Sequence, residues 1–357
     1  MKFIHCADLH LDSSINALSS EKAKLRKEEL LRTFERMVDY ALENSVTAII
    51  IAGDMFDVKK VSAKTKGRII HKIEMAQSLD FLYLSGNHDE DNFISDLEYV
   101  PQNLKIFSSE WKEFRYGTVN VSGVVINEQN SKLIYDKLDL LENDINIVVM
   151  HGQVAGYVSS DGAEIISIPL LKNKHIDYLA LGHYHSFEVK RIDERGVFCY
   201  SGCLEGRGFD ETGDKGFVLI DVNERIEYTF VPFAKRTLKE IEFNVSNYNS
   251  WYDATDAIIK YVGEIAHSSE LVKLTLFGEY TLDFDIDVVS LSERLNELYF
   301  FAKIKDKTQL KVTVEDFVHD KGVKGEFVRE VLSSELDAEM KQEIIMAGLN
   351  ALKGKEL

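Results

Sequence analysis

The chain has 357 residues, 45% hydrophobic and 29% charged, which is the composition of a soluble globular protein of two or three domains. Its formal net charge of −18 argues against a generalised basic surface, so any binding of nucleic acid must depend on local cations or on metal ions. Three cysteines without metal-like spacing indicate a reducing compartment and structural thiols rather than a disulfide framework. Without a signal peptide or a run of about 20 apolar residues, the expected location is the cytoplasm, with no membrane contact.

The first part of the chain alternates between strand-like and helix-like patterns. Continuous apolar runs predict strands at 2–8, 46–54 and 81–87, and helical spacing predicts helices at 21–44 and 62–79. This order favours a parallel sheet covered by helices. Two later strand patterns, at 145–152 and 176–185, each lead into a glycine and a histidine, and 111–126 is typical of a strand pair that turns near Gly117.

From about residue 187, short alternating strands predict a second, antiparallel-rich sheet packed on the first. The predicted fold class for 1–233 is therefore an α/β sandwich of two sheets flanked by helices. A small α/β domain is predicted at 234–315, and a helical segment at 316–357. The small domain is expected to contain strands at 236–245, 271–277 and 309–314 and helices at 250–266 and 290–300. The apolar face of the last helix either packs on its own domain or docks a partner.

Polar side chains follow five predicted strands, just past the point where each strand ends. They are Asp8, His10, Asp54, Asp57, Asn87, His88, Asp89, His151, His183 and His185. Because the carboxyl ends of strands in an open parallel sheet meet at one crevice, we expect these side chains to gather in one place. A single histidine at a strand end is more often structural, but five groups in this order predict a site.

The residue types in this set predict a pair of metal ions. Carboxylate, amide and imidazole groups without thiolate suit Mn, Fe or Zn. The set exceeds what one ion can bind, so two ions sharing one bridging carboxylate are expected, and Asp54 in the middle strand is the natural bridge. The expected further ligands are Asp8, His10 and His185 for one ion and Asn87, His151 and His183 for the other.

Two metal ions about 3.5–4 Å apart form a clamp for in-line attack at phosphorus, with a hydroxide held between them as the nucleophile. His88 is then expected to face the phosphoryl group, where it stabilises charge or protonates the leaving oxygen. Asp89 is expected to orient His88 through its other ring nitrogen.

The order "DLH", "GDMFD", "GNHD", "HG", "GHYH" resembles the motifs of the calcineurin-type metallophosphoesterases over roughly residues 1–186. Within them, "FIHCADLHLDSS" and "YLALGHYH" resemble the first and last motifs of the SbcD-type DNA-repair nucleases. "YSGCLEGRGFDETGDKGF" (200–217) is similar to the YhaO-related exonuclease-like proteins. This resemblance implies Mn-dependent phosphodiester hydrolysis on DNA and an SMC-like ATPase partner of the SbcC type. It also implies a capping role for 234–315 and docking of the ATPase by the C-terminal helices. Many relatives are dimers, and the apolar faces in 21–44 and 81–98 would serve either a homodimer contact or the core.

The chain departs from the family pattern at two positions. Asp57 stands where some members have a second histidine in the second motif, which leaves the direction of any exonuclease activity open. Phe187 stands where a proline often follows the last motif, and this is expected to change the loop rather than metal binding.

A cationic run at 57–72 is the candidate contact for a phosphate backbone, because no acid follows Asp57 in it. A solvated helix face explains these cations equally well. The candidate DNA contacts are Lys59, Lys60, Lys64, Lys66, Arg68 and, in the glycine-rich "GCLEGRGF" loop, Arg207.

Three functions fit these observations. The first is a DNA exonuclease or endonuclease that works with an ATPase. The second is a phosphodiesterase or phosphatase acting on a small nucleotide or a phosphoprotein, since the same metal pair serves either reaction. The third is a scaffold that keeps the ligands without catalysis. The extra C-terminal region favours the first, and the intact ligand set with His88 argues against the third.

Overall fold

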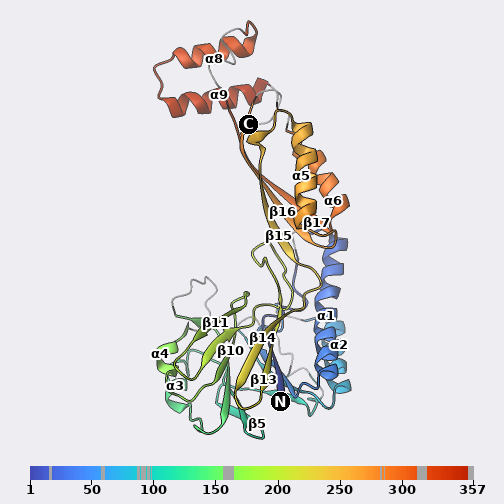
Figure 1. Cartoon of the computed structure of the whole chain (residues 1–357), viewed down its shortest axis with the longest axis vertical. Coiled ribbons are helices and arrows are strands. Elements are labelled where there is room, and N and C mark those ends of the chain that lie inside the picture. The colour runs from blue at the N-terminus through green and yellow to red at the C-terminus, as the bar shows by residue number, and fades with distance from the viewer. Residues whose placement is uncertain are drawn as a thin grey trace. The chain divides into compact units, whose positions relative to one another are not determined.

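The computed structural model describes residues 1–15, 18–57, 61–86, 89, 94, 97, 99–155, 165–281, 284, 286–311 and 320–352. The chain forms two compact units, Met1–Leu238 and Lys239–Leu357 (Figure 1). Both predicted C-terminal segments, 234–315 and 316–357, belong almost entirely to the second unit. Whether they act as separate domains stays a prediction.

The first sheet of the first unit is built around parallel strands. Its order is β14 (Ile226–Pro232), β13 (Gly216–Val222), β1 (Lys2–Cys6), β2 (Ala48–Ala52), β3 (Asp80–Leu84) and β4 (Leu104–Ile106). β1 to β4 are parallel, as the alternation of strands and helices predicts, and β13 pairs antiparallel with the free edge of β1.

The second sheet is also parallel at its centre. Its order is β11 (Glu188–Arg191), β12 (Val197–Tyr200), β10 (Tyr178–Gly182), β7 (Ile145–His151), β6 (Val119–Gly123) and β5 (Lys112–Tyr116). Only the pairs at its two edges are antiparallel. The expectation of an antiparallel-rich second sheet built from the strands after residue 187 was therefore wrong in detail. Two of those strands, β13 and β14, extend the first sheet, because period-2 alternation marks a strand without naming its partner.

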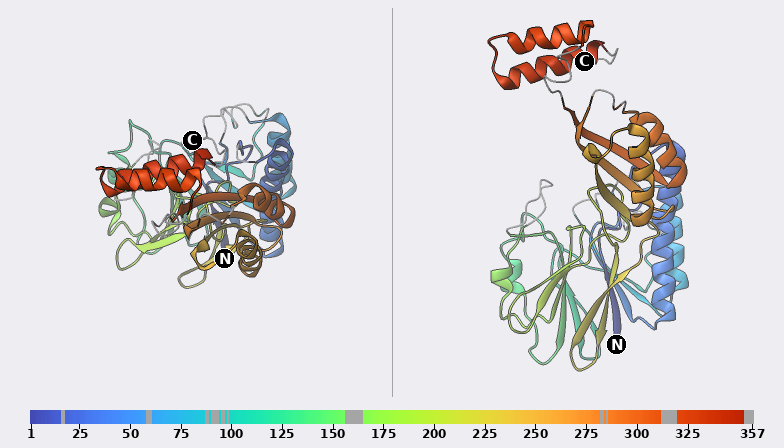
Figure 2. Two further views of the ribbon diagram at one scale, coloured as in Figure 1. Left: turned by 90° about the horizontal axis from the view of Figure 1, so that it is seen from above. Right: turned by 45° about the horizontal axis from the view of Figure 1, so that its top comes forward.

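The two sheets face each other across a shared core, and helices cover their outer faces (Figures 1 and 2). Phe3, Ile50 and Leu82 of the first sheet belong to the same buried cluster as Val149 and Tyr178 of the second. On the outer face of the first sheet lie α1 (Ser20–Glu43) and α2 (Ala63–Met75). α3 (Ile134–Lys137), α4 (Ile168–Leu171) and the short strands β8 (Gln153–Val154) and β9 (Ile165–Ile166) belong to the second half of the unit.

The outer helices begin at side-chain caps. Ser19 accepts a hydrogen bond from Lys22 N at the start of α1, and Ser62 accepts one from Thr65 N at the start of α2. The apolar face of α1, which includes the fully buried Phe34, packs on the first sheet. α2 ends at Met75 rather than at the predicted residue 79.

The second unit contains a three-stranded sheet with two helices packed on it. The elements are β15 (Leu238–Asn244), η1 (Val245–Asn247), α5 (Trp251–Ile265), β16 (Leu271–Tyr280), α6 (Val288–Leu298) and β17 (Phe301–Leu310), with β16 in the centre. The predicted strand at 309–314 was misplaced, because β17 begins at Phe301 and pairs in parallel with the whole of β16. Lysines at 303, 305 and 307 interrupt the apolar pattern by which a strand is recognised in the sequence.

The chain continues into a helical hairpin of α8 (Val323–Ser333) and α9 (Ala338–Leu352). Ile345 and Leu349 of α9 are buried against Val328 of α8, whereas Met340 and Ile344 of the predicted apolar face remain partly exposed. Docking of a partner by this hairpin stays a prediction. Among the helices in the described residues, none is both long enough and apolar enough to span a membrane.

Candidate metal centre

The predicted site residues come from the carboxyl ends of central strands in both sheets. Asp8 and His10 follow β1, Asp54 follows β2, and His151 is the last residue of β7. His183 and His185 follow β10. Asn87 and His88, which follow β3, lie outside the described residues.

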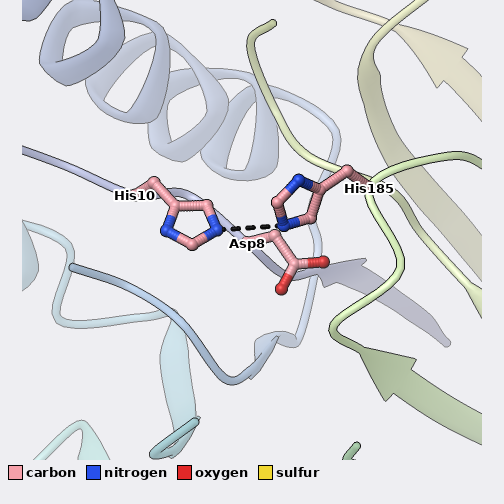
Figure 3. Close-up of side chains that lie close together, drawn as sticks. All are labelled: Asp8, His10 and His185. Carbon is pink, nitrogen blue, oxygen red and sulfur yellow. Dashed lines mark hydrogen bonds between the residues drawn. The ribbon is translucent and has the colours of Figure 1, made fainter. Parts of the chain in front are cut away.

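The first cluster consists of Asp8, His10 and His185. Each of them offers one ligand atom, and these atoms lie within 4.8 Å of one another. The two imidazoles point at each other, with 3.1 Å between His10 Nε2 and His185 Nε2, and the Asp8 carboxylate lies beside them (Figure 3). The chain thus brings together, from both sheets, the three residues predicted to bind one ion.

The second cluster consists of Asp54, His151 and His183, again with ligand atoms within 4.8 Å. His151 Nε2 lies 3.3 Å from Asp54 Oδ2, and both side chains are almost fully buried. His151 Nδ1 is 2.9 Å from the carbonyl oxygen of Ala52, so this ring can donate to the backbone and keep Nε2 for the cluster. These residues are the described part of the set predicted for the second ion.

The strand-end loops hold these residues in backbone conformations that non-glycine residues seldom adopt. Asp8, His10 and Asp54 have φ values of 52°, 44° and 52°, and His183 has a φ of 104°. Backbone hydrogen bonds tie the loops together, from Asp8 N to Gly53 O and from His10 N to Asp54 O, both 3.1 Å. The Asp8 carboxylate in turn accepts the backbone N–H of His183 at 2.9 Å. Such clustered backbone strain is typical of functional sites.

Glycines allow the second cluster to form close to the backbone. A Cβ at Gly86 would lie 2.1 Å from Asp54 Oδ1, and a Cβ at Gly182 would lie 2.0 Å from Ala52 O and 2.7 Å from His151 Nδ1. Any side chain at either position would therefore displace a predicted ligand or its support.

Two carboxylates lie behind the histidines of the first cluster. Glu211 Oε1 is 2.7 Å from His185 Nδ1, and Asp57 Oδ1 is 3.4 Å from His10 Nδ1. Arg207 lies between the two acids and donates to both, at 2.9 Å to each. Lys215, buried, donates to the carbonyl oxygen of His185 at 2.7 Å. Sequence reasoning missed Glu211, because nothing in its spacing places it against a histidine of another segment.

Burial and charge together set the ionisation of these groups. Burial lowers the pKa of His151, but the Asp54 carboxylate outweighs it and raises that pKa to about 9. Burial dominates at His10 and lowers its pKa, which favours the neutral imidazole that a ligand requires. Burial would raise the pKa values of Asp57 and Glu211, but the neighbouring histidines and Arg207 outweigh it. The pKa of Asp57 falls to about 2 and that of Glu211 falls well below its usual range, so both acids are ionised at neutral pH.

Asp89, predicted to orient His88, connects the loops after β2 and β3. Its carboxylate accepts the backbone N–H groups of Phe56 and Gly86, both at 2.9 Å, and that of Met55 at 3.3 Å. Burial, followed by the charge of Asp54, raises the pKa of Asp89 to about 6. Its predicted contact with His88 lies outside the described residues.

The cations proposed as DNA contacts have acidic neighbours. Arg68 donates to Glu28 and Glu35 of α1, each at 2.6 Å, and Lys64 lies 3.6 Å from Glu28. Arg207 is held by Asp57 and Glu211, as described above. Lys59 and Lys60 lie outside the described residues, and Lys66 lies in the first turn of α2, where its backbone N–H donates to Ser62 O. Carboxylates of α1, rather than an unfilled phosphate site, thus account for the charge at Lys64 and Arg68, and DNA contact at these six positions stays a prediction.

The donor set of each cluster fits a divalent transition-metal ion. Imidazole and carboxylate atoms converge from buried or half-buried positions, and in the second cluster glycines allow Asp54 and His151 to lie close to the backbone. Cys6, Cys199 and Cys203 are buried outside both clusters, as the sequence predicts.

Comparison with known proteins agrees with this geometry. A family model described as calcineurin-like phosphoesterase matches residues 1–187. The uncharacterized metallophosphoesterase YhaO of Bacillus subtilis is 31% identical over 245 residues, which are 64% of this chain and 60% of that protein. The DNA double-strand break repair protein Mre11 of Sulfolobus acidocaldarius is 25% identical over 245 residues, 62% of this chain and 61% of that protein. The chain thus spans about three fifths of the length of these relatives.

Among solved structures, a dimetal phosphatase from Danio rerio aligns with a TM-score of 0.45 and 11% identity over 65% of this chain and 99% of that one. The family model covers more than half of the chain and includes every residue of both clusters. The chain therefore belongs to the calcineurin-like phosphoesterases, and its two candidate clusters in this fold imply two divalent metal ions.

Proposed function

We propose that the protein is a Mn-dependent DNA nuclease that acts in DNA repair as a subunit of an SbcC-like ATPase complex. The observation that carries this proposal is the pair of three-residue clusters whose loops are hydrogen-bonded to each other at the ends of β1 and β2. The relatives named Mre11 support DNA as the substrate. The phosphoesterase family supports hydrolysis at phosphorus.

In this proposal, residues at the ends of the central strands would hold two metal ions. Two divalent ions, when bound, supply Lewis acidity and lower the pKa of water towards 7. Asp8, His10 and His185 would hold one ion, and His151, His183 and Asn87 would hold the other, with Asp54 as the carboxylate available to both.

His88, the residue after Asn87, is proposed to stabilise the developing charge or to protonate the leaving oxygen. Asp89 is proposed to orient His88, and its carboxylate accepts the backbone N–H groups of Phe56 and Gly86.

The parts of the chain outside this site are assigned by the same proposal. Residues 234–315 would cap the DNA groove, and 316–357 would dock the coiled coil of the ATPase. The exposed apolar side chains of α9, Met340 and Ile344, are suited to such a contact. The apolar face of α1 that could serve a homodimer packs on the first sheet, so a homodimer would need another surface.

One observation favours a second candidate function, a phosphodiesterase or phosphatase that acts on a small nucleotide or a phosphoprotein. Arg68 and Arg207 are each held by two carboxylates, which leaves a weaker cationic track for a DNA backbone than the sequence indicates.

A nuclease assay separates the two functions. Full-length protein with Mn²⁺ would be given end-labelled duplex and single-stranded DNA and, separately, a chromogenic phosphodiester. Asp54→Asn and His88→Ala are expected to lose DNA degradation. Arg195→Gln serves as the control, since Arg195 holds Asp177 at 2.8 Å in a cluster apart from the metal ligands, and it should keep activity. Hydrolysis of the ester with DNA left intact, even with the organism's SbcC-like ATPase and ATP, would replace the nuclease by the small-substrate enzyme.

A further inference from the structure

We propose that Asp57, Arg207 and Glu211 form a positioning brace that orients the two histidines of the first cluster and so sets the metal affinity of that site. This inference assigns a role to Asp57, which stands where some family members have a second histidine, and to Arg207, for which the sequence suggested DNA. It rests on the two-metal site and is independent of DNA as the substrate.

The brace begins at the outer nitrogen of each histidine. Glu211 Oε1 lies 2.7 Å from His185 Nδ1, and Asp57 Oδ1 lies 3.4 Å from His10 Nδ1. At His185 the hydrogen bond from Nδ1 to Glu211 holds the proton there and leaves Nε2 as the electron-pair donor, whereas Asp57 acts on His10 over the longer distance of an ion pair. The two Nε2 atoms then face each other, 3.1 Å apart, beside Asp8 (Figure 3).

Arg207 joins the two halves of the brace. Its Nη1 donates to Asp57 Oδ2 and its Nη2 to Glu211 Oε1, both at 2.9 Å, and its backbone N–H donates to Glu211 Oε2 at 2.7 Å. Only 19% of its side chain is exposed, and Glu211 is 3% exposed. The rigid guanidinium fork can bond two carboxylates in different directions at once, which an ammonium group cannot do in the same geometry.

Arg207 also offsets part of the negative charge that Asp57 and Glu211 place beside the first cluster. Two ionised acids next to Asp8 would repel one another and compete for the metal ion, and the single cation of Arg207 offsets part of that repulsion. Ser13 completes the arrangement by donating to Asp57 Oδ2 at 2.8 Å.

The two clusters differ in the group that faces the outer nitrogen of their histidines. The outer nitrogen of His151 faces a backbone carbonyl, that of Ala52, at 2.9 Å, so no side-chain substitution can remove its acceptor. Loss of the brace should therefore weaken metal binding at the first cluster and leave the second cluster unchanged. A residue with only a general structural role would weaken both sites.

The test is binding of Mn²⁺ alone to the full-length protein, measured by calorimetry and by paramagnetic resonance. Glu211→Gln and Arg207→Gln are expected to lower the affinity of one site by about 10- to 100-fold and to leave the other site unchanged. The spectrum should change from that of a coupled pair to that of a single ion. Arg207→Lys, which keeps the charge, should recover only part of the affinity.

Arg195→Gln is the matched control, because Arg195 is also held by a carboxylate and by backbone carbonyls, those of Glu142 and Asp144, but touches no ligand. Circular dichroism and thermal melting of every variant show that it folds. The double variant Asp57→Asn, Glu211→Gln should bind Mn²⁺ as tightly as the triple variant that also carries Arg207→Gln. Arg207 acts through the two carboxylates, and the double variant no longer has them. Unchanged affinity in both single variants, or an equal loss at both sites, would overturn the proposal, whether or not the protein cleaves DNA.

Discussion

Replacing Gly182 by alanine tests the close approach of the two sheets at the metal centre. Gly182 ends β10, and its added Cβ would lie 2.0 Å from Ala52 O, 2.7 Å from His151 Nδ1 and 2.8 Å from Ala7 Cβ. None of these atoms is the end of a flexible side chain, so the backbone of β2 or β10 must move. Overpacking of this kind costs about 1–3 kcal/mol. In a unit of this size each kcal/mol lowers Tm by about 2–4 °C.

The same substitution at Gly67 provides the control. Gly67 is an exposed residue inside α2, and a Cβ there would meet no atom within 4 Å. Alanine at such a position should stabilise the protein by about 0.5–1 kcal/mol, because the unfolded chain loses freedom and the helix gains propensity. Both variants replace glycine by alanine. In scanning calorimetry, Gly182→Ala should lower Tm and Gly67→Ala should raise it.

The effect of Gly182→Ala on the metal centre follows from the same contact. The Cβ would press on the His151 ring and on the carbonyl that holds its Nδ1 at 2.9 Å. We therefore expect this variant to lose the divalent metal ion from the second cluster, whereas Gly67→Ala should keep both ions. A Gly182→Ala protein that melts at or above the wild-type temperature with two bound ions would refute the packing argument.

Further predictions concern buried charges and thiols in the first unit. Arg26→Met should lower the unfolding free energy in a urea titration by about 3–5 kcal/mol, because the buried Arg26 holds Glu29 and Glu205 at 2.8 and 3.0 Å. At Glu29 burial is outweighed by Arg236 and Arg26, which lower its pKa, so its contribution to stability is present above the usual pKa of a glutamate and is lost as the pH falls through the depressed value. Glu29→Gln should therefore flatten the acid limb of the plot of Tm against pH. Burial raises the pKa of Cys199 to about 12, so the native protein should not react with a thiol reagent at neutral pH until it is unfolded.

The sequence predicts the parallel centre of the first sheet and two groups of candidate metal ligands, and the structure brings the described members of each group together. Asp8, Asp54 and His151 each follow a continuous apolar run, and such runs mark strands buried on both faces, whose ends lie at one edge. His5, which lies inside the first of these strands, is buried in the core with its Nδ1 2.9 Å from Tyr178 Oη.

What the sequence could not predict depends on contacts between distant segments. Glu211 meets His185 only because the loop after β12 folds back over the end of β10, and Asp57 meets Arg207 across 150 residues of chain. The edge strand β17 was misplaced because its lysines face outward and its backbone pairing with β16 leaves no apolar signature.

The cationic run at 57–72 shows how a charge pattern changes meaning once its neighbours are known. Lys64, Arg68 and Lys72 recur every fourth residue and so form one stripe along α2. This stripe faces acids of α1: Arg68 binds Glu28 and Glu35, and Lys72 lies 2.5 Å from Asp39. The acids recur at 28, 35 and 39, the spacing of one helical face, so the two stripes match as an interhelical row of ion pairs. In a chain of net charge −18, attraction of a phosphate to this unit would then depend mainly on the metal ions rather than on these side chains.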